Sequence, residues 1–117
     1  MDCRDEMTHA SKAERIRELN DRLRTTGLGG RTLLTRAFAA LPQDQMLQIL
    51  ARIRQFDDFD GGNDPWREHD FGQVGHDGAR YFWKIDVYDV NLEFGSPDPS
   101  DETVTCRVLT VMTEQDL

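Results

Sequence analysis

The sequence predicts a two-layer α+β fold, with two helices beside a mainly antiparallel sheet of about four strands. Two segments carry apolar residues at helical spacing, and later segments are rich in β-branched and aromatic residues. An Asp-Gly pair between two of those later segments is typical of a β-hairpin. The expected order is helix, strand, helix, strand, strand, strand. Without internal repeats, this order favours helices packed on one sheet.

A length of 117 residues suits one domain. Residues 1–10 are polar and lack periodicity, so we expect a flexible N-terminal tail followed by a single domain over residues 11–113. No apolar run approaches the roughly 20 residues of a membrane span, and the acidic, arginine-containing start does not resemble a secretion signal. The only cysteines are Cys3 and Cys106. We therefore expect reduced thiols and a cytoplasmic location.

The first helix is expected over residues 12–26. Ser11 and Glu14 have the spacing of a capping box at its start, and glycines follow its end. Residues 31–36 are then expected to form a short strand, and residues 37–41 a connection.

The second helix is expected to begin at Pro42 and to carry a wide apolar stripe as far as Phe56. Proline is tolerated in a first helical turn, because the N–H that it lacks would have no partner there. Asp44 in the first turn and Arg52 and Arg54 in the last turn match the helix dipole.

Two strands are expected at residues 69–74 and 79–88, joined by a turn at Asp77-Gly78. The second strand alternates so that one face is apolar and the other is mixed. After a long connection, residues 103–112 are expected to form the last strand, and the final five residues a tail.

Charge is divided unequally along the chain. The net charge of −8 combines +3 in residues 1–56 with −11 in residues 57–117. This asymmetry predicts an acidic surface in the C-terminal half that docks a protein partner with a basic surface. It equally allows the two halves to neutralise each other inside the fold. A net negative charge argues against direct binding of duplex nucleic acid.

The loop after the second helix is dense in carboxylates, and a flexible, oxygen-rich loop can bind Ca²⁺ or Mg²⁺. Its spacing does not match an EF-hand, and the structural alternative is that Asp and Asn side chains cap turns. A metal-binding or metal-assisted hydrolytic site is therefore a second functional hypothesis. Its candidate ligands are Asp57, Asp58, Asp64, Glu68, His69 and Asp86.

His69 could act in acid–base chemistry only with a partner from another segment. In a strand its side chain would point away from Glu68 and Asp70, whereas Lys84 or Asp86 on the next strand could lie opposite it. We favour a partly buried histidine bonded to a neighbouring carboxylate or carbonyl.

Lys84 and Asp86 resemble part of a metal-dependent nuclease motif, which needs a Glu two residues before the Lys. Position 82 is Phe. We therefore expect Lys84 and Asp86 to form a surface charge cluster with Arg80 or Arg107.

Trp66 lies in the polar loop directly after Pro65. We expect it to cover the core as a lid, and the alternative is an exposed aromatic residue used for recognition.

No motif for a catalytic nucleophile, a phosphate-binding loop or a zinc site is present, so neither an enzyme nor a cofactor is favoured. The favoured hypothesis is a non-enzymatic interaction protein, and the sequence leaves its oligomeric state open. The candidate partner-binding residues are Asp57, Asp58, Asp64, Trp66, Glu68, His69, Asp70, Lys84, Asp86, Asp89 and Asp98.

Six motifs, most of them in the acidic half, are Phe56-Asp57-Asp58-Phe59, Asn63-Asp64-Pro65-Trp66, Glu68-His69-Asp70-Phe71-Gly72, Trp83-Lys84-Ile85-Asp86, Gly95-Ser96-Pro97-Asp98-Pro99 and Arg107-Val108-Leu109-Thr110. Together they resemble an uncharacterised bacterial family, the domain of unknown function 3768, over a span expected to run from the first helix to Met112. The resemblance implies a small single-domain protein, often encoded on plasmids, integrated elements or phage of alphaproteobacteria. It implies no activity, ligand or catalytic residue. A mobile-element protein with this charge could mimic nucleic acid toward a host nuclease, defence complex or DNA-binding regulator.

Overall fold

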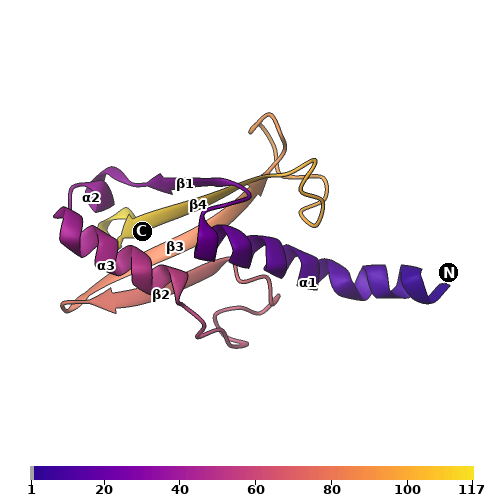
Figure 1. Cartoon of the computed structure of the whole chain (residues 1–117), viewed down its shortest axis with the longest axis horizontal. Coiled ribbons are helices and arrows are strands. Elements are labelled where there is room, and N and C mark those ends of the chain that lie inside the picture. Colours follow the sequence, from indigo (N-terminus) through magenta and orange to yellow (C-terminus); the bar gives the residue numbers. More distant parts are fainter. Residues whose placement is uncertain (1) are drawn as a thin grey trace.

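The structure is a computed structural model that describes the backbone of residues 2–117 and the side chains of residues 12–117. A search of this part of the chain finds no helix long and apolar enough to cross a membrane. The elements, shown in Figure 1, are α1 (Asp2–Thr26), β1 (Arg31–Leu34), α2 (Arg36–Ala39), α3 (Gln43–Arg54), β2 (Phe71–His76), β3 (Ala79–Tyr88), β4 (Cys106–Thr113) and the 3₁₀ turn η1 (Glu114–Asp116).

The four strands form one sheet in the order β1-β4-β3-β2. β3 pairs antiparallel with both β2 and β4, whereas β1 runs parallel to β4. The predicted α+β class is confirmed, and the sheet is mixed because one edge strand is parallel. α1 and α3 lie on the same side of the sheet, so the fold has two layers (Figure 1).

The core lies between the helices and the sheet face that they cover. Trp83 of β3 is fully buried at its centre and meets the ring of Phe56 edge-on, with centroids 5.7 Å apart. Residues of β3 alternate in and out of this core, as predicted. The buried members of the cluster are Leu23, Phe38, Ile49, Ile53, Tyr81, Trp83, Ile85, Leu109 and Val111.

Two predictions for the helices were wrong. α1 begins at Asp2 and not at residue 12, so Ser11 lies within the helix and is not its N-cap. Of the expected tail, Met1 lies outside the described residues, as do the side chains of residues 2–10. The expected connection at residues 37–41 contains most of α2, because the Thr35 hydroxyl accepts a hydrogen bond from Phe38 N and caps this single turn.

The β2–β3 hairpin has the predicted Asp-Gly turn, with Asp77 at φ 50° and Gly78 at φ 80°. β2 begins at Phe71, and not at residue 69, because His69 has the left-handed φ of 54° that no strand accommodates. β4 begins at Cys106 and not at residue 103, since the Asp101 side chain holds Thr103 in a turn.

The end of the chain is ordered into η1 and is not the tail that we expected. The Asp116 carboxylate accepts hydrogen bonds from the Thr113 backbone and from the Thr35 hydroxyl, 2.8 and 2.7 Å away. These hydrogen bonds lower the pKa of Asp116 from its usual value. A hydrogen bond therefore links the last residues to Thr35, the N-cap of α2.

Candidate functional site

The loop between α3 and β2, residues 57–69, is shaped by its own Asp and Asn side chains. The Asp60 carboxylate accepts hydrogen bonds from the backbone of Gly62 and Asn63, and Asn63 Nδ2 donates to Asp58 O. The geometry therefore agrees with the structural alternative for this acidic loop, in which Asp and Asn side chains cap its turns.

Asp64 anchors the second half of this loop. It is only 5% exposed, and its Oδ1 accepts hydrogen bonds from the backbone N–H groups of Glu68 and His69, both 3.1 Å away. A buried carboxylate with two such donors holds the backbone in one conformation. This explains how Arg67 and His69 are kept at left-handed φ values of 57° and 54°.

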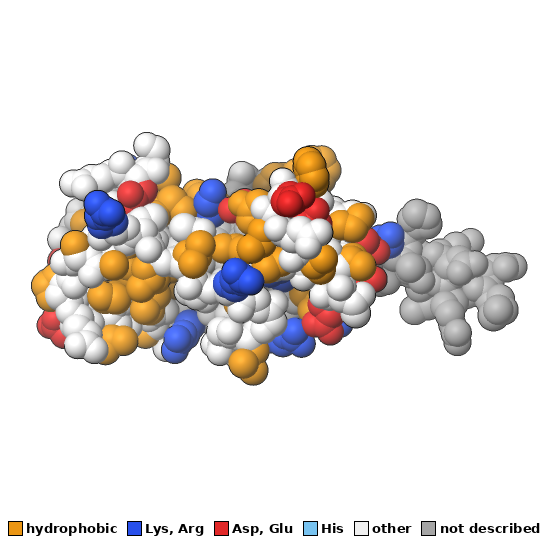
Figure 2. Space-filling model, turned by 90° about the horizontal axis from the view of Figure 1, so that it is seen from above, with side chains coloured by type: hydrophobic (Ala, Val, Ile, Leu, Met, Phe, Trp, Pro, Cys, Tyr) orange, Lys and Arg blue, Asp and Glu red, His pale blue; other side chains and the backbone are white. Residues whose placement is uncertain are grey.

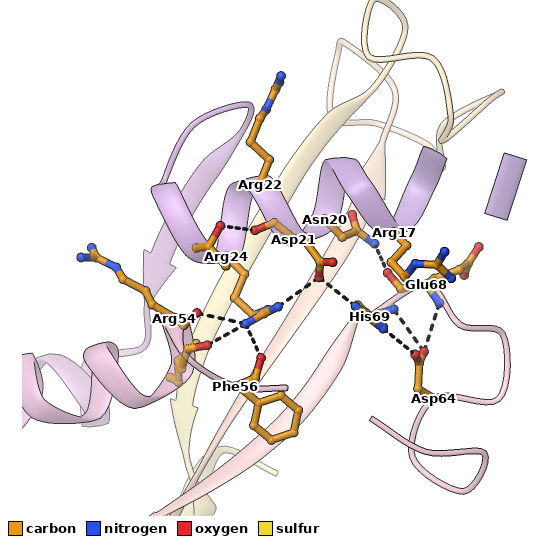
Figure 3. A network of polar contacts seen from close by, with 12 residues as sticks. Arg17, Asn20, Asp21, Arg22, Arg24, Arg54, Phe56, Asp64, Glu68 and His69 are labelled. Carbon is orange, nitrogen blue, oxygen red and sulfur yellow. Dashed lines mark hydrogen bonds and ion pairs between the residues drawn. The ribbon is translucent and has the colours of Figure 1, made fainter. Parts of the chain in front are cut away.

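His69 joins this loop to α1 (Figure 3). Its Nδ1 lies 2.9 Å from Asp21 Oδ1, and its Nε2 lies 3.5 Å from Asp64 Oδ2. The ring also stacks on Phe59, with centroids 3.6 Å apart and planes 3° from parallel. The favoured prediction, a partly buried histidine bonded to a carboxylate, is confirmed, although neither Lys84 nor Asp86 is the partner.

Arg24 extends the same network to the end of α3. Its Nη1 donates to the carbonyl oxygens of Ile53, Arg54 and Phe56 at 3.0, 3.3 and 2.8 Å, and its Nη2 donates to Asp21 at 3.0 Å. The last carbonyls of a helix lack partners within the helix, so a buried guanidinium placed there acts as its C-terminal cap.

Asn20 makes a third link between α1 and the rest of the fold. It is buried, its Nδ2 donates to Glu68 O at 2.9 Å, and its Oδ1 accepts a hydrogen bond from Arg107 Nε at 2.8 Å. Arg107 also donates to Pro99 O. Three neighbouring residues of α1 thus hold the acidic loop, the end of α3 and β4 together.

A hollow of about 430 Å³ opens beside this network, lined by Arg17, Phe59, Asp60, Gly61, Asp64, Pro65, Arg67 and His69. Acid–base catalysis requires an imidazole nitrogen that can reach a substrate. Both nitrogens of His69 face carboxylates, so the arrangement favours a structural role for this histidine. Among the side chains of residues 12–117, no group of three or more His, Cys, Asp or Glu is placed to hold a metal ion.

Four carboxylates gather where the loop meets the β2–β3 hairpin. Burial raises the pKa of Glu68, and the negative charges of Asp70 and Asp64 add to the effect. Burial likewise raises the pKa of Asp70, with contributions from Asp64 and Asp86. The like charges are thus close enough to disfavour the ionisation of Glu68 and of Asp70. Asp64 is buried, so we call the other three, Glu68, Asp70 and Asp86, the acidic patch.

The charge cluster predicted on β3 is confirmed only for its central pair. Lys84 Nζ lies 3.2 Å from Asp86 Oδ2. Arg80 pairs instead with Glu114, which lies in the 3₁₀ turn. Arg107 belongs to the buried network around Asn20, because its side chain faces the helices and not the open side of the sheet.

Trp66 is exposed over 77% of its surface, so the prediction of a lid over the core was wrong. The reversal of the loop at Arg67 and the anchoring of Asp64 turn the Trp66 side chain outward. The alternative, an exposed aromatic available for recognition, fits the geometry.

The remaining candidates lie apart from the acidic patch. Asp57 and Asp58 are exposed at the start of the loop, and Asp89 Oδ1 accepts a hydrogen bond from Glu93 N in the β3–β4 connection. Asp98 accepts hydrogen bonds from Ser100, which hold its pKa below the usual value.

Part of the charge asymmetry is neutralised by ion pairs at the surface between the two halves of the chain. Lys12 lies 3.8 Å from Asp98, and Arg15 and Arg22 both pair with Glu102, at 3.8 and 2.8 Å. On the face drawn in Figure 2, Lys and Arg side chains are interspersed with Asp and Glu, so the negative charge is not continuous there.

Sequence reasoning missed Asn20, Asp21 and Arg24, because they lie in the basic half and far from the loop in the sequence. One signal was available. Asn20 and Arg24 lie four residues apart and next to Leu19 and Leu23 on the helix surface, and polar residues beside apolar ones in this way indicate side chains that are buried with partners.

Searches of curated proteins and of solved structures find no match to the chain. A family model described as "Protein of unknown function (DUF3768)" matches residues 34–116. The matched region includes the loop and the acidic patch. α1, which we expected within the resemblance, lies outside it. The match covers well over half of the sequence, and the chain therefore belongs to the DUF3768 family.

Proposed function

We propose that this chain is a non-enzymatic interaction protein that binds a basic segment of another protein at the acidic patch. The observation that carries the proposal is the position of Glu68 beside the buried Asp64, whose carboxylate accepts the Glu68 N–H at 3.1 Å, with Asp70 close enough that the charges of Asp64 and Asp86 raise its pKa. Like charges held together store unfavourable electrostatic energy, and a cationic side chain from a partner would relieve it.

A lysine or arginine suits this arrangement better than a metal ion. Ca²⁺ and Mg²⁺ need several oxygen ligands converging at about 2.0–2.6 Å. The described carboxylates do not converge in this way, since Asp64 is occupied by two backbone N–H groups and by His69. A long basic side chain gains from the same field without such geometry.

Trp66 supplies an apolar contact in the same loop. Exposed tryptophans are enriched among the residues that dominate binding energy, because they bury a large area when a partner docks. The anchoring of Asp64 and His69 presents Trp66 on a rigid loop, which lowers the entropy lost on binding. A partner that normally binds nucleic acid carries a basic surface of the kind that this site would recognise.

The test measures the binding of a fluorescent nona-lysine peptide in low salt and in physiological salt. We expect salt-sensitive binding that Glu68→Gln, Asp70→Asn and Asp86→Asn together weaken at least tenfold. The matched control changes the same number of charges elsewhere, at Asp57, Asp58 and Asp89, and should bind nearly as the natural chain does. Equal loss in both triple variants would show a response to net charge alone and would refute the acidic patch as the site.

A further inference from the structure

The outer edge of β2 has unpaired backbone groups. Ile85 N donates to Asp70 O, which sets the alternation of hydrogen-bonded pairs between β2 and β3. By this alternation the N–H and C=O groups of Phe71, Gln73 and Gly75 point away from β3. Within the described chain only Gly75 O has a partner on this side, the exposed Arg52 side chain at 2.7 Å.

β2 lacks the features that usually protect a sheet edge. Its sequence, Phe-Gly-Gln-Val-Gly-His, contains no Asp, Glu, Lys, Arg or Pro, although 31% of the chain is charged. Charged residues, prolines and short length normally prevent an edge strand from pairing with another chain. The opposite edge, β1, is protected in this way, because it has only four residues and begins with Arg31.

We propose that β2 pairs antiparallel with β2 of a second copy across a two-fold axis at Gln73, which joins two four-stranded sheets into one. In this register Gln73 lies opposite Gln73 of the second copy, and Phe71 lies opposite Gly75. All three residues that point outward then form hydrogen-bonded pairs, and no outward group of the strand is left without a partner.

The side chains on both faces of the sheet suit this register. Phe71 is 41% exposed beside Phe82, and the Gly75 of the second copy leaves room for its ring. Gly75 O would exchange the Arg52 side chain for a backbone N–H. Arg52 would then lie on the helix-covered side, near Asp70 of the second copy, and would give that carboxylate a cation. Glu68 and Asp86 remain for a basic partner, so the dimer does not depend on the proposed function.

The first test is the mass of the full chain by light scattering over a range of concentrations. We expect a mass that approaches twice the 13.5 kDa of one chain as concentration rises. Gln73→Lys should restore the monomer, because it places two like charges at the two-fold axis, and circular dichroism checks that it is folded. Leu33→Lys, on the exposed edge β1, should leave the dimer intact. A natural chain that is monomeric throughout, or a dimer that dissociates with Leu33→Lys and not with Gln73→Lys, would overturn the proposal.

A crosslink tests the register independently of the lysine variants. Hydrogen-bonded antiparallel partners have Cα atoms about 5.5 Å apart, within the range that a disulfide spans. With Cys3 and Cys106 replaced by Ser, Gln73→Cys should oxidise to a covalent dimer, and Leu33→Cys should not. Similar yields from the two cysteines would indicate random collision and would contradict the pairing.

Discussion

Replacing Arg24 by Met should destabilise the protein by about 3 kcal/mol. Met has a similar length and no charge, so the change removes the hydrogen bonds while it keeps most of the packing. The carbonyls of Arg54 and Phe56 are partly buried and accept no other hydrogen bond in the described chain, and each hydrogen bond from a charged donor contributes about 1.5–3 kcal/mol. Asp21 also loses one of its two partners and keeps His69, at a smaller cost because Asp21 is partly exposed. Removing a buried charge returns some of this energy.

Urea unfolding followed by tryptophan fluorescence measures this loss, since the buried Trp83 lies 5.2 Å from the Arg24 guanidinium. Arg54→Met is the matched control, because Arg54 lies at the same end of α3 with its side chain exposed. We expect the control to change the free energy of unfolding by less than about 0.5 kcal/mol. If Arg24→Met loses no more than the control, Arg24 does not cap α3 and the network has no energetic role.

Three further changes test the loop and the hairpin. Asp64→Ala should speed hydrogen exchange at the Glu68 and His69 amides by at least tenfold, whereas protection like that of the natural chain would show that Asp64 is not the anchor. Burial raises the pKa of Glu68 in the folded state, so its protonation favours folding below the unfolded value of 4.5, and this contribution is lost as pH rises through the folded pKa. Glu68→Gln should therefore raise the urea midpoint at pH 7, by less than about 1 kcal/mol in stability, and a lower midpoint would contradict this sign. Gly72→Ala places a Cβ 2.6 Å from Trp83 Nε1 and should cost about 1–3 kcal/mol, whereas Gly95→Ala, outside β2, meets nothing within 4 Å; equal thermal shifts in the two would argue against the close approach.

The parts of the fold that depend on local pattern could be predicted from the sequence. The ends of β3 at Ala79 and Tyr88 follow from alternation and from the Asp77-Gly78 turn, and α3 follows from its apolar stripe. The parallel pairing of β1 with β4 could not be predicted, because it joins residues far apart in the chain and has no local signature. α2 was missed because a single helical turn depends on the hydroxyl of Thr35 and not on periodicity.

The candidate site shows the same division. The sequence indicated that the acidic loop and His69 belong together, and the structure brings Asp64, Glu68 and Asp70 into one region. The sequence could not indicate Asp21, because the hydrogen bond between Asp21 and His69 joins residues 48 positions apart. Trp66 was expected to cover the core on the strength of its hydrophobicity. The left-handed backbone at Arg67 overrides that preference. A left-handed φ can be anticipated from the sequence where the residue is glycine, and an arginine gives no such signal.

The position of α1 means that the unit that folds is larger than the unit that the family pattern recognises. The matched region, residues 34–116, contains the whole acidic loop, yet Leu19 and Leu23 fill its core and Asn20 and Arg24 satisfy its carbonyls from outside that region. A fragment cut at the boundary of the match would expose Trp83 and leave α3 without its cap. Comparisons among relatives should therefore follow substitutions in the segment before residue 34 together with those in the loop, because a change in either must be accommodated by the other.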